Sequence, residues 1–531
     1  MKFLRSFFCA VILLLVVSAV LVSQPVAANN DTYPSVSFRT EPPVFRKLSQ
    51  IPQRAGNPGL SELLQGDEES RGTEEQFELP AIERMQIREH YEHRDLAAGE
   101  MRALAAAPSP RLRASFPGID PPSIVQPDSM IAAGPTRLMA AVNSTVAIYS
   151  KAGKRVFQTT FDQWFSPLAG TVGGSGYFDP QLLYDQYQGR WIFVCDARRA
   201  DRRSWYLLSV SKTSNPQGEW AFWAIDMQQT GGGRVDLWAD FPRLGVDGSA
   251  VYLTANMFTF RTYIFKFGKI RVLKKSELYN YGALTTYEFS RMVDAGGALA
   301  RNIHAAHNYG PSPLGYLVNT RNDAGNKITM WAVNTTGQPT LTRIPVQVSS
   351  YKTPPQAQQK GGGAVINTAT EGTGALSAVF RGGFLYTAHA ISHNWGSGEV
   401  SALRFYQVDA TGKVKQEVTF GSDGLSYYMP ALSVNSRGDV VMTFNRSGRN
   451  EFAGIFYSGR RAADPLGAFS QSVLLKAGEA NYAAVFSGSN IARWGDYAAV
   501  AVDPSNQTFW FFNEFVKAAT EWNAVIANVS Y

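Results

Sequence analysis

Cysteine is almost absent from this chain of 531 residues, which contains only Cys9 and Cys195. Cys9 lies in the N-terminal apolar stretch, so a processed chain would keep one cysteine and could form no intrachain disulfide. Stability must therefore come from a buried core, and 45% hydrophobic residues are ample for one. No later apolar run approaches the roughly 20 residues needed to cross a bilayer. We expect no membrane span after signal cleavage.

Several catalytic signatures are also missing. The chain has no Gly-x-Ser-x-Gly elbow, no His-Glu-x-x-His and no Walker loop, which argues against the enzyme classes that depend on them. Its net charge of +7 falls to +5 when Lys2 and Arg5 leave with an N-terminal signal, and that excess is spread along the chain. We therefore expect no nucleic-acid partner.

The N-terminus has the pattern of a secretory signal peptide. Lys2 and Arg5 precede an apolar run, and Val26-Ala27-Ala28 supplies a small-residue cleavage site. Residues 1–28 are thus predicted to be removed, and the protein to be secreted, periplasmic or extracellular. A retained N-terminal anchor is the alternative, because the run over 7–22 is long for a signal.

Residues 29–117 differ in composition from the rest of the chain. They carry dense mixed charge, and 82–106 is rich in helix formers between Pro80 and Pro108. We interpret them as a partly helical or disordered N-terminal extension, with a propeptide or docking segment as the alternative.

From residue 118 to 531 a repeat replaces the helical signal. Each unit has a polar or Asp-aromatic step, a short strand, a turn and a second strand rich in Val, Tyr, Trp and Phe. Starts lie about 50 to 70 residues apart, which leaves room for two further strands, as in 204–211 and 220–226. Four antiparallel strands per repeat predict an all-β fold, a seven-bladed β-propeller, with six or eight blades as alternatives. The segments are 120–154, 177–199, 239–258, 304–323, 374–396, 427–448 and 494–515.

Two turns support this layout. "TSNPQGEW" (213–220) and "AADPLGAF" (462–469) share the order Asx, Pro, any residue, Gly, any residue, aromatic, and both fall between the expected third and fourth strands. The final "EWNAVIANVSY" reads as a last strand, and pairing across the join between the first and last blades would close the ring.

These turns resemble the Ser-x-Asp-x-Gly-x-x-Trp turn of sialidase-like, Asp-box propellers, with a different Asx-to-aromatic spacing. The "WGDY" and Asp-Phe-Pro steps are similar to those of secreted bacterial propellers. The sialidase resemblance implies an arginine cluster, an Asp acid/base and a Tyr nucleophile activated by Glu. Candidate catalytic residues under that hypothesis are Asp240, Asp496, Arg321 and Arg446, with Arg198 as a further arginine. The family's N-terminal arginine step is absent.

Three aspartates each begin a predicted innermost strand: Asp179, Asp240 and Asp496. Their carboxylates could converge at one rim of the channel and bind a cation or a polyhydroxylated ligand. The alternative is that each Asp caps backbone amides and ties one blade to the next. We predict no cofactor, while leaving open a structural cation such as calcium.

Four histidines fall in two consecutive repeats. Imidazoles are good metal ligands, so His304, His307, His389 and His393 are weak candidates for metal binding. On a strand, however, residues i and i+4 lie about 13 Å apart and i, i+3 point to opposite faces. We therefore predict no metal at these residues, and add His389 to the candidate ligand-binding residues.

The Gly-rich stretch 360–376 opens no helix, so it is interpreted as a loop insertion and a candidate partner contact. Taken together, the sequence favours a monomeric, non-catalytic module that binds an extracellular glycan, peptide or protein. A glycoside hydrolase with its site at the channel mouth is the alternative, and whether the chain is an enzyme stays undecided.

Overall fold

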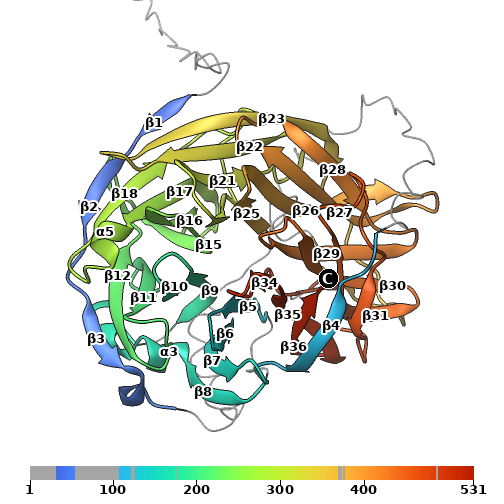
Figure 1. The fold of residues 1–531 in the computed structure, drawn as a ribbon, viewed down its shortest axis with the longest axis horizontal. Coiled ribbons are helices and arrows are strands. Elements are labelled where there is room, and N and C mark those ends of the chain that lie inside the picture. The colour runs from blue at the N-terminus through green and yellow to red at the C-terminus, as the bar shows by residue number, and fades with distance from the viewer. Residues whose placement is uncertain are drawn as a thin grey trace, which may run out of the picture.

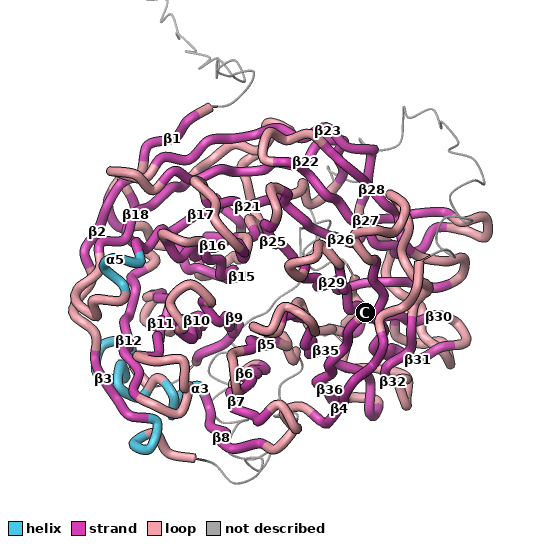
Figure 2. Tube along the Cα trace, in the orientation of Figure 1, coloured by secondary structure: helices cyan, strands magenta, loops and turns pink. Residues whose placement is uncertain are grey.

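Strands make up nearly all the secondary structure of this protein, which we describe from a computed structural model (Figure 2). The described residues are 31–53, 107–120, 126–174, 176–368, 374, 377–485 and 488–531. The predicted signal peptide and the predicted helix over 82–106 lie outside them. No helix in these ranges is long and apolar enough to cross a membrane.

The fold is a β-propeller: groups of antiparallel strands are arranged around a common centre, with β5, β9, β15, β25, β29 and β34 innermost (Figure 1). The strands in the first half of the ring are β5 (Met130–Ala133), β6 (Arg137–Val142), β7 (Thr145–Ser150), β8 (Arg155–Thr160), β9 (Tyr177–Asp185), β10 (Arg190–Arg198), β11 (Ser204–Ser211), β12 (Glu219–Asp226), β15 (Leu237–Val246), β16 (Ala250–Thr259), β17 (Phe265–Lys274) and β18 (Thr285–Ser290). Each consecutive set of four forms one antiparallel group.

The second half of the ring continues this pattern. Its groups are β19 (His304–Ala305), β21 (Gly315–Asn319), β22 (Ala324–Asn334), β23 (Thr340–Lys352); β25 (Ser377–Arg381), β26 (Phe384–Asn394), β27 (Glu399–Asp409), β28 (Val414–Phe420); β29 (Leu425–Val434), β30 (Val440–Gly448), β31 (Glu451–Arg460), β32 (Val473–Lys476); and β34 (Ala499–Val502), β35 (Phe509–Ala518), β36 (Glu521–Ser530), β4 (Arg111–Pro117). β20 (His307–Tyr309) pairs in parallel with β15 and β25, and so joins their two groups into one ten-stranded sheet.

The remaining elements are short. They are η1 (Leu48–Gln50), α3 (Phe161–Trp164), η2 (Ser166–Leu168), α4 (Ala169–Val172), α5 (Lys275–Leu278), β13 (Gln229–Thr230), β14 (Gly233–Arg234), β24 (Val365–Ile366) and β33 (Ile491–Ala492). Buried apolar residues fill the spaces between neighbouring groups, so each group packs its two faces against the next ones around the ring.

The two predicted turns are present where the sequence places them. Asn215 Oδ1 accepts a hydrogen bond from the Gln217 amide at 3.1 Å between β11 and β12, and the Trp220 ring returns into the core. Between β31 and β32, the Asp464 carboxylate accepts from the Arg461 amide, Gly467 has a φ of 84°, and Phe469 is buried. The Asx cap, the permissive glycine and the buried aromatic ring all serve the roles expected of them.

The predicted extension contains four strands that its sequence pattern does not indicate. β1 (Thr32–Pro34), β2 (Val36–Arg39) and β3 (Val44–Lys47) add outer strands to β23, β18 and β12, and they run along the outside of three groups (Figure 1). They are short and mostly exposed, without apolar alternation, because the edges they pair with supply their stability.

β4 also falls within the predicted extension, yet it is the outer strand of the last group. It pairs with β36, and Phe116 of β4 lies 5.9 Å from the Tyr149 ring and 6.1 Å from the Trp510 ring. Tyr149 belongs to β7 and Trp510 to β35. The predicted last strand at the C-terminus is confirmed, and the chain that precedes β5 closes the ring by pairing with it.

The Gly-rich segment is not a simple loop in its described part. β24 pairs in parallel with β33, and Gln359 exchanges hydrogen bonds with the backbone of Tyr482. Asn481 donates to the carbonyls of Lys360 and Gly362. The segment thus docks on the loop that leads to the last group.

Candidate functional site

The innermost strands share a distortion at one end of the ring. The pairings of β9, β15 and β29 shift register near their starts, and a residue there takes a positive φ: Asp179 (52°), Phe241 (58°) and Met429 (48°). Each is followed by a proline, which has no backbone N–H to donate to the neighbouring strand and therefore suits a position where the pairing is interrupted. Positive φ is uncommon for residues with a side chain, and β-bulges re-aim the side chains beside them.

Three aspartates meet at this end of β9, β10 and β15. One carboxylate oxygen from each of Asp179, Asp196 and Asp240 lies within 4.8 Å of those of the other two. Asp196 is 1% exposed and Asp179 8%, whereas Asp240 is partly exposed. We call these three residues the carboxylate cluster.

The members of the cluster differ in their hydrogen bonds. The Tyr497 hydroxyl donates to Asp179 Oδ2 at 2.7 Å, and the Phe241 amide donates to Asp240 Oδ1 at 2.9 Å. Both carboxylate oxygens of Asp196 are buried and have no hydrogen-bond partner among the described residues. Unsatisfied buried polar groups are rare in folded proteins, so Asp196 requires an explanation.

Burial and like charge both act on these carboxyl groups. Burial raises the pKa of Asp196 well above its ordinary value, and the negative charges of Asp179 and Asp240 raise it further. Burial also raises the pKa of Asp179, although the Tyr497 hydrogen bond and the Arg243 charge oppose this. Without a compensating cation, the cluster therefore favours bound protons.

Arg243 acts on the pKa of Asp179, but its guanidinium packs between two aromatic rings. Its guanidinium carbon lies 3.9 Å from the Phe241 ring centroid and 3.8 Å from that of Tyr497. The side chain is 2% exposed, and its Nε and Nη2 are buried without a hydrogen-bond partner among the described residues. The two aromatic faces fix this arginine by cation–π contact rather than by an ion pair with the cluster.

A second acidic group adjoins the first. Asp128 Oδ1 accepts from the Asp496 amide at 2.6 Å, and Gln126 Nε2 donates to Asp496 Oδ2 at 3.0 Å. Asn143 donates to Asp128 and accepts from the Asp179 amide. These bonds link the group that begins with β5 to the one that begins with β9 and to the last group of the ring. Asp128 therefore links neighbouring groups by hydrogen bonds, which is the structural role predicted for Asp side chains. The carboxylate cluster shows this role only in part.

Glu514 of β35 is the other buried acid here. Ser129 Oγ donates to its Oε2 at 3.3 Å, and burial raises the pKa of Glu514 to about 8. A Cβ added at Gly495 would come within 2.6 Å of Glu514 Oε1, so a larger residue there would require this carboxyl group to move.

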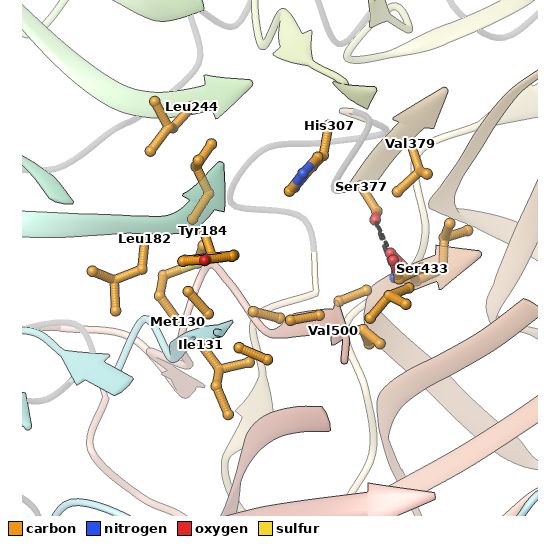
Figure 3. A pocket seen from close by; sticks show the side chains of 18 of the residues that line it. Met130, Ile131, Leu182, Tyr184, Leu244, His307, Ser377, Val379, Ser433 and Val500 are labelled. Carbon is orange, nitrogen blue, oxygen red and sulfur yellow. Dashed lines mark hydrogen bonds between the residues drawn. The ribbon is translucent and has the colours of Figure 1, made fainter. Parts of the chain in front are cut away.

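An axial cavity of about 480 Å³ lies next to these acids. Gln181 and His304, two residues after the positive-φ positions Asp179 and Asn302, belong to its wall. Most of the lining is aliphatic, as the side chains of Leu182, Leu244, Val379 and Val500 in Figure 3 show.

The candidate histidines are separated by the structure. His304 and His307 both line the cavity, where burial lowers the pKa of His304 well below its usual value and that of His307 to about 3. His307 Nε2 lies 2.7 Å from Gln186 Oε1. His389 is fully buried against Tyr406, and His393 packs on Trp395. No group of three possible metal ligands in the described part of the chain includes any of these four.

The candidate arginines form contacts outside the carboxylate cluster. Arg321 pairs with Asp323 on the surface, and Arg446 pairs with Glu451 over the Phe456 ring. Arg198 lies over the Trp238 ring at 4.3 Å. The structure thus brings Asp179 and Asp240 together, and places Asp496 in the adjoining acidic group.

Sequence reasoning missed Asp196, Arg243, Tyr497 and Glu514. A usable signal existed for Asp196, because it occupies a shared position on the second strand of each group. Asn143, Asn256 and Asn445 occupy this position in other groups, where each faces the residue just before the innermost strand's bend. Asp196 faces Phe178 in the same way, so it is an aspartate at a position where these three groups have asparagine.

We expect Tyr497→Phe to lower the free energy of unfolding by about 1–3 kcal/mol, because it leaves a buried carboxylate oxygen without its donor. Urea unfolding measures this. Tyr457→Phe is the matched control, since the Tyr457 hydroxyl makes no hydrogen bond among the described residues. Equal effects in both variants would contradict the role given to the Tyr497 hydroxyl.

Comparison with known proteins finds solved structures that are similar only at low sequence identity. No family model matches the chain, and no curated protein matches it. Among solved structures, an alpha-L-arabinanase of Penicillium chrysogenum is 9% identical, with 80% of this chain and 99% of that chain covered and a TM-score of 0.36. An alpha-L-arabinofuranosidase of Fusarium graminearum is 8% identical, with 79% and 98% covered and a TM-score of 0.38.

A sialidase of Trypanosoma rangeli is 8% identical, with 79% of this chain and 60% of that chain covered and a TM-score of 0.36. The resemblance to sialidase-like propellers that the sequence predicts is confirmed at the level of these similarities. At such identities and TM-scores, the neighbours say nothing about what this chain binds or catalyses.

Proposed function

We propose that this chain is an exported, non-catalytic binding module whose axial cavity takes an apolar segment of an extracellular peptide or protein. The observation that supports it is the chemistry of the cavity wall, in which most of the lining residues have aliphatic side chains. Its volume of about 480 Å³ falls in the range of about 300–1,000 Å³ that small-ligand sites occupy.

A peptide fits this wall better than a glycan does. Residues with polar side chains, such as Gln181, Ser377 and Ser433, are a minority of the lining, and a sugar would need many hydrogen bonds to replace its water. Apolar side chains lose nothing on entering such a cavity and gain by leaving water.

The cavity lacks the groups that hydrolysis requires. Asp503 is its one carboxylate among the described residues, and it forms an ion pair with Lys151 at 2.6 Å. Burial would raise the pKa of Asp503, but the Lys151 bond and local amide donors lower it overall. The lowered pKa values of His304 and His307 leave both neutral, so the wall offers no paired acid and base.

A glycoside hydrolase is the second candidate, and the carboxylate cluster favours it. Retaining glycosidases place two carboxyl groups about 5–5.5 Å apart, and one of them has a raised pKa. However, Asp196 is 1% exposed, and no member of the cluster lines the axial cavity or the surface pocket around Arg202 and Arg234. A substrate would need an opening there to reach these groups, so we place binding first.

We also infer that the ring has seven blades. Each of the seven predicted repeat segments supplies the first two strands of an antiparallel group. The ten-stranded sheet counts as two blades, because β15 and β20 are joined through a single residue pair, Val246 and His307. An experimental electron-density map would test this count.

A random peptide display library, selected on the immobilised protein, tests the proposed ligand class. We expect selected peptides to share apolar residues and to bind with a 1:1 stoichiometry. Val500→Trp should weaken binding by at least about tenfold, because the larger side chain occupies the space that the ligand needs. Leu466→Trp is the control, since Leu466 is exposed on the turn after β31.

Two outcomes would overturn the proposal. The first is selected binding that Val500→Trp leaves intact. The second is a glycan array on which the protein binds sugars while no peptide is enriched.

A further inference from the structure

We infer that the carboxylate cluster of Asp179, Asp196 and Asp240 is a calcium site that ties the β9–β12 group to the β15–β18 group. This inference does not depend on the proposed peptide binding, because no member of the cluster lines the axial cavity among the described residues.

The geometry suits one shared cation. Calcium binds oxygens at about 2.3–2.6 Å, so two oxygens on one ion can be at most about 5 Å apart. The three carboxylate oxygens lie within 4.8 Å of one another and come from β9, β10 and β15. An ion between them would be bound by three separate strands.

Asp196 is the observation that distinguishes this cluster from a set of ordinary strand caps. It is 1% exposed, and both its oxygens lack hydrogen-bond partners within the described ranges, while one of them faces Asp179 and Asp240. Burial of a carboxylate costs on the order of several kcal/mol unless something compensates its charge. A bound cation would satisfy both oxygens and the charge together.

The other groups show what this position does when no ion is required. The side-chain oxygen of Asn143 accepts a hydrogen bond from the backbone amide of Asp179 in the next group. Asn256 accepts one from the backbone amide of Asn302 in the same way. For Asp196, the corresponding backbone amide in the next group is that of Phe241, and this amide donates to Asp240 instead. Asp196 therefore gives up the link between groups that asparagine makes, and keeps its oxygens available for a ligand.

No nearby cation fills that role. Arg243 is clamped between two aromatic rings, and no described lysine or arginine lies within ion-pair distance of Asp196. Burial and the two neighbouring carboxylates all raise the pKa of Asp196. A bound divalent cation would instead favour the ionised carboxylate and so lower this pKa.

The ligand set favours calcium among common ions. It contains only carboxylate oxygens, with no imidazole or thiolate, which disfavours zinc and copper. Magnesium dehydrates reluctantly and usually keeps several waters, which a buried cluster cannot readily hold. Calcium accepts irregular coordination by mono- or bidentate carboxylates.

The test is calcium titration of the full-length protein after chelator treatment and dialysis, by calorimetry and by thermal unfolding. We expect one Ca²⁺ per chain and a melting temperature that rises with calcium concentration. Asp196→Asn should fold, because asparagine occupies this position in other groups, and should bind calcium at least about tenfold more weakly. Glu514→Gln is the matched control, a buried acid at the corresponding position of β35, and should bind like the unmodified protein.

The inference is overturned if the unmodified, folded protein binds no Ca²⁺ at millimolar concentration, or if Asp196→Asn binds it as tightly. Tighter binding of Mg²⁺ than of Ca²⁺ would also overturn it. If Asp196→Asn does not fold, Asp240→Asn replaces it with the same expected loss of binding. Peptide binding is measured separately, so that its failure and that of the calcium site remain distinguishable.

Discussion

A chain truncated to begin at residue 119 should fail to give a cooperatively folded protein, whereas one beginning at residue 54 should fold. The longer truncation removes β4, which pairs with β36 from Arg111 to Pro117. It also removes Phe116, which contacts aromatic rings of the first and last strand groups. The ring would then lose the contact that joins its two ends, and β36 would present an unpaired edge.

The shorter truncation removes the outer strands β1, β2 and β3 and also η1, with the buried Leu48 and Ile51. It breaks the ion pair of Asp31 with Arg343, which is almost fully buried, and the contact of Tyr33 with Trp331. Loss of Asp31 takes an ion-pair partner from the buried Arg343, so this variant should be less stable but still folded. Circular dichroism and thermal unfolding of both truncations measure the difference. Equal folding of the two chains would contradict closure of the ring by β4.

The unmodified protein should become less stable as the pH rises, and Glu514→Gln should remove a large part of this decrease in the free energy of unfolding. The folded-state pKa of Glu514 is raised from an ordinary 4.5 to about 8, so folding favours the protonated form. The stability from this group is fully present below pH 4.5 and is lost as the pH rises through about 8. The change corresponds to about 5 kcal/mol, since one pKa unit is about 1.4 kcal/mol.

The measurement is urea unfolding at pH 5 and pH 9 in chelator, for the unmodified protein and for Glu514→Gln. Glutamine retains an oxygen that can accept from Ser129, so the variant should lose the pH dependence without losing this hydrogen bond. The same difference in stability between the two pH values for both proteins would show that Glu514 is ionised when folded. Buried Asp128 also has a raised pKa and contributes to both proteins alike.

Much of the fold could be predicted because its signals are local. The Asx-Pro turns at 213–220 and 462–469 and the alternating strands recur with similar spacing, and the structure places all of them as expected. β1 to β4 could not be predicted, since three to seven residues with mostly exposed side chains carry no periodic pattern. They are strands because an edge elsewhere in the chain pairs with them.

The candidate site could be predicted only in part. Asp179 and Asp240 stand out in sequence because they begin strands, and they do converge. Asp196 meets them through the pairing of β10 with β9, where it faces Phe178. Tyr497 meets them through the closure of the ring, which joins residues about 300 positions apart, as in the bond from Tyr497 to Asp179. The histidines were singled out by spacing alone, and their positions between rings and in the cavity wall depend on packing that spacing does not encode.

The most direct test of the central claim is calorimetric titration with a selected apolar peptide, followed by mass spectrometry of the recovered peptide. Binding without catalysis predicts a reversible 1:1 complex, an intact ligand after prolonged incubation, and loss of binding in Val500→Trp but not in Leu466→Trp. A cleaved ligand, or binding that is unchanged when the axial cavity is filled, would contradict the account.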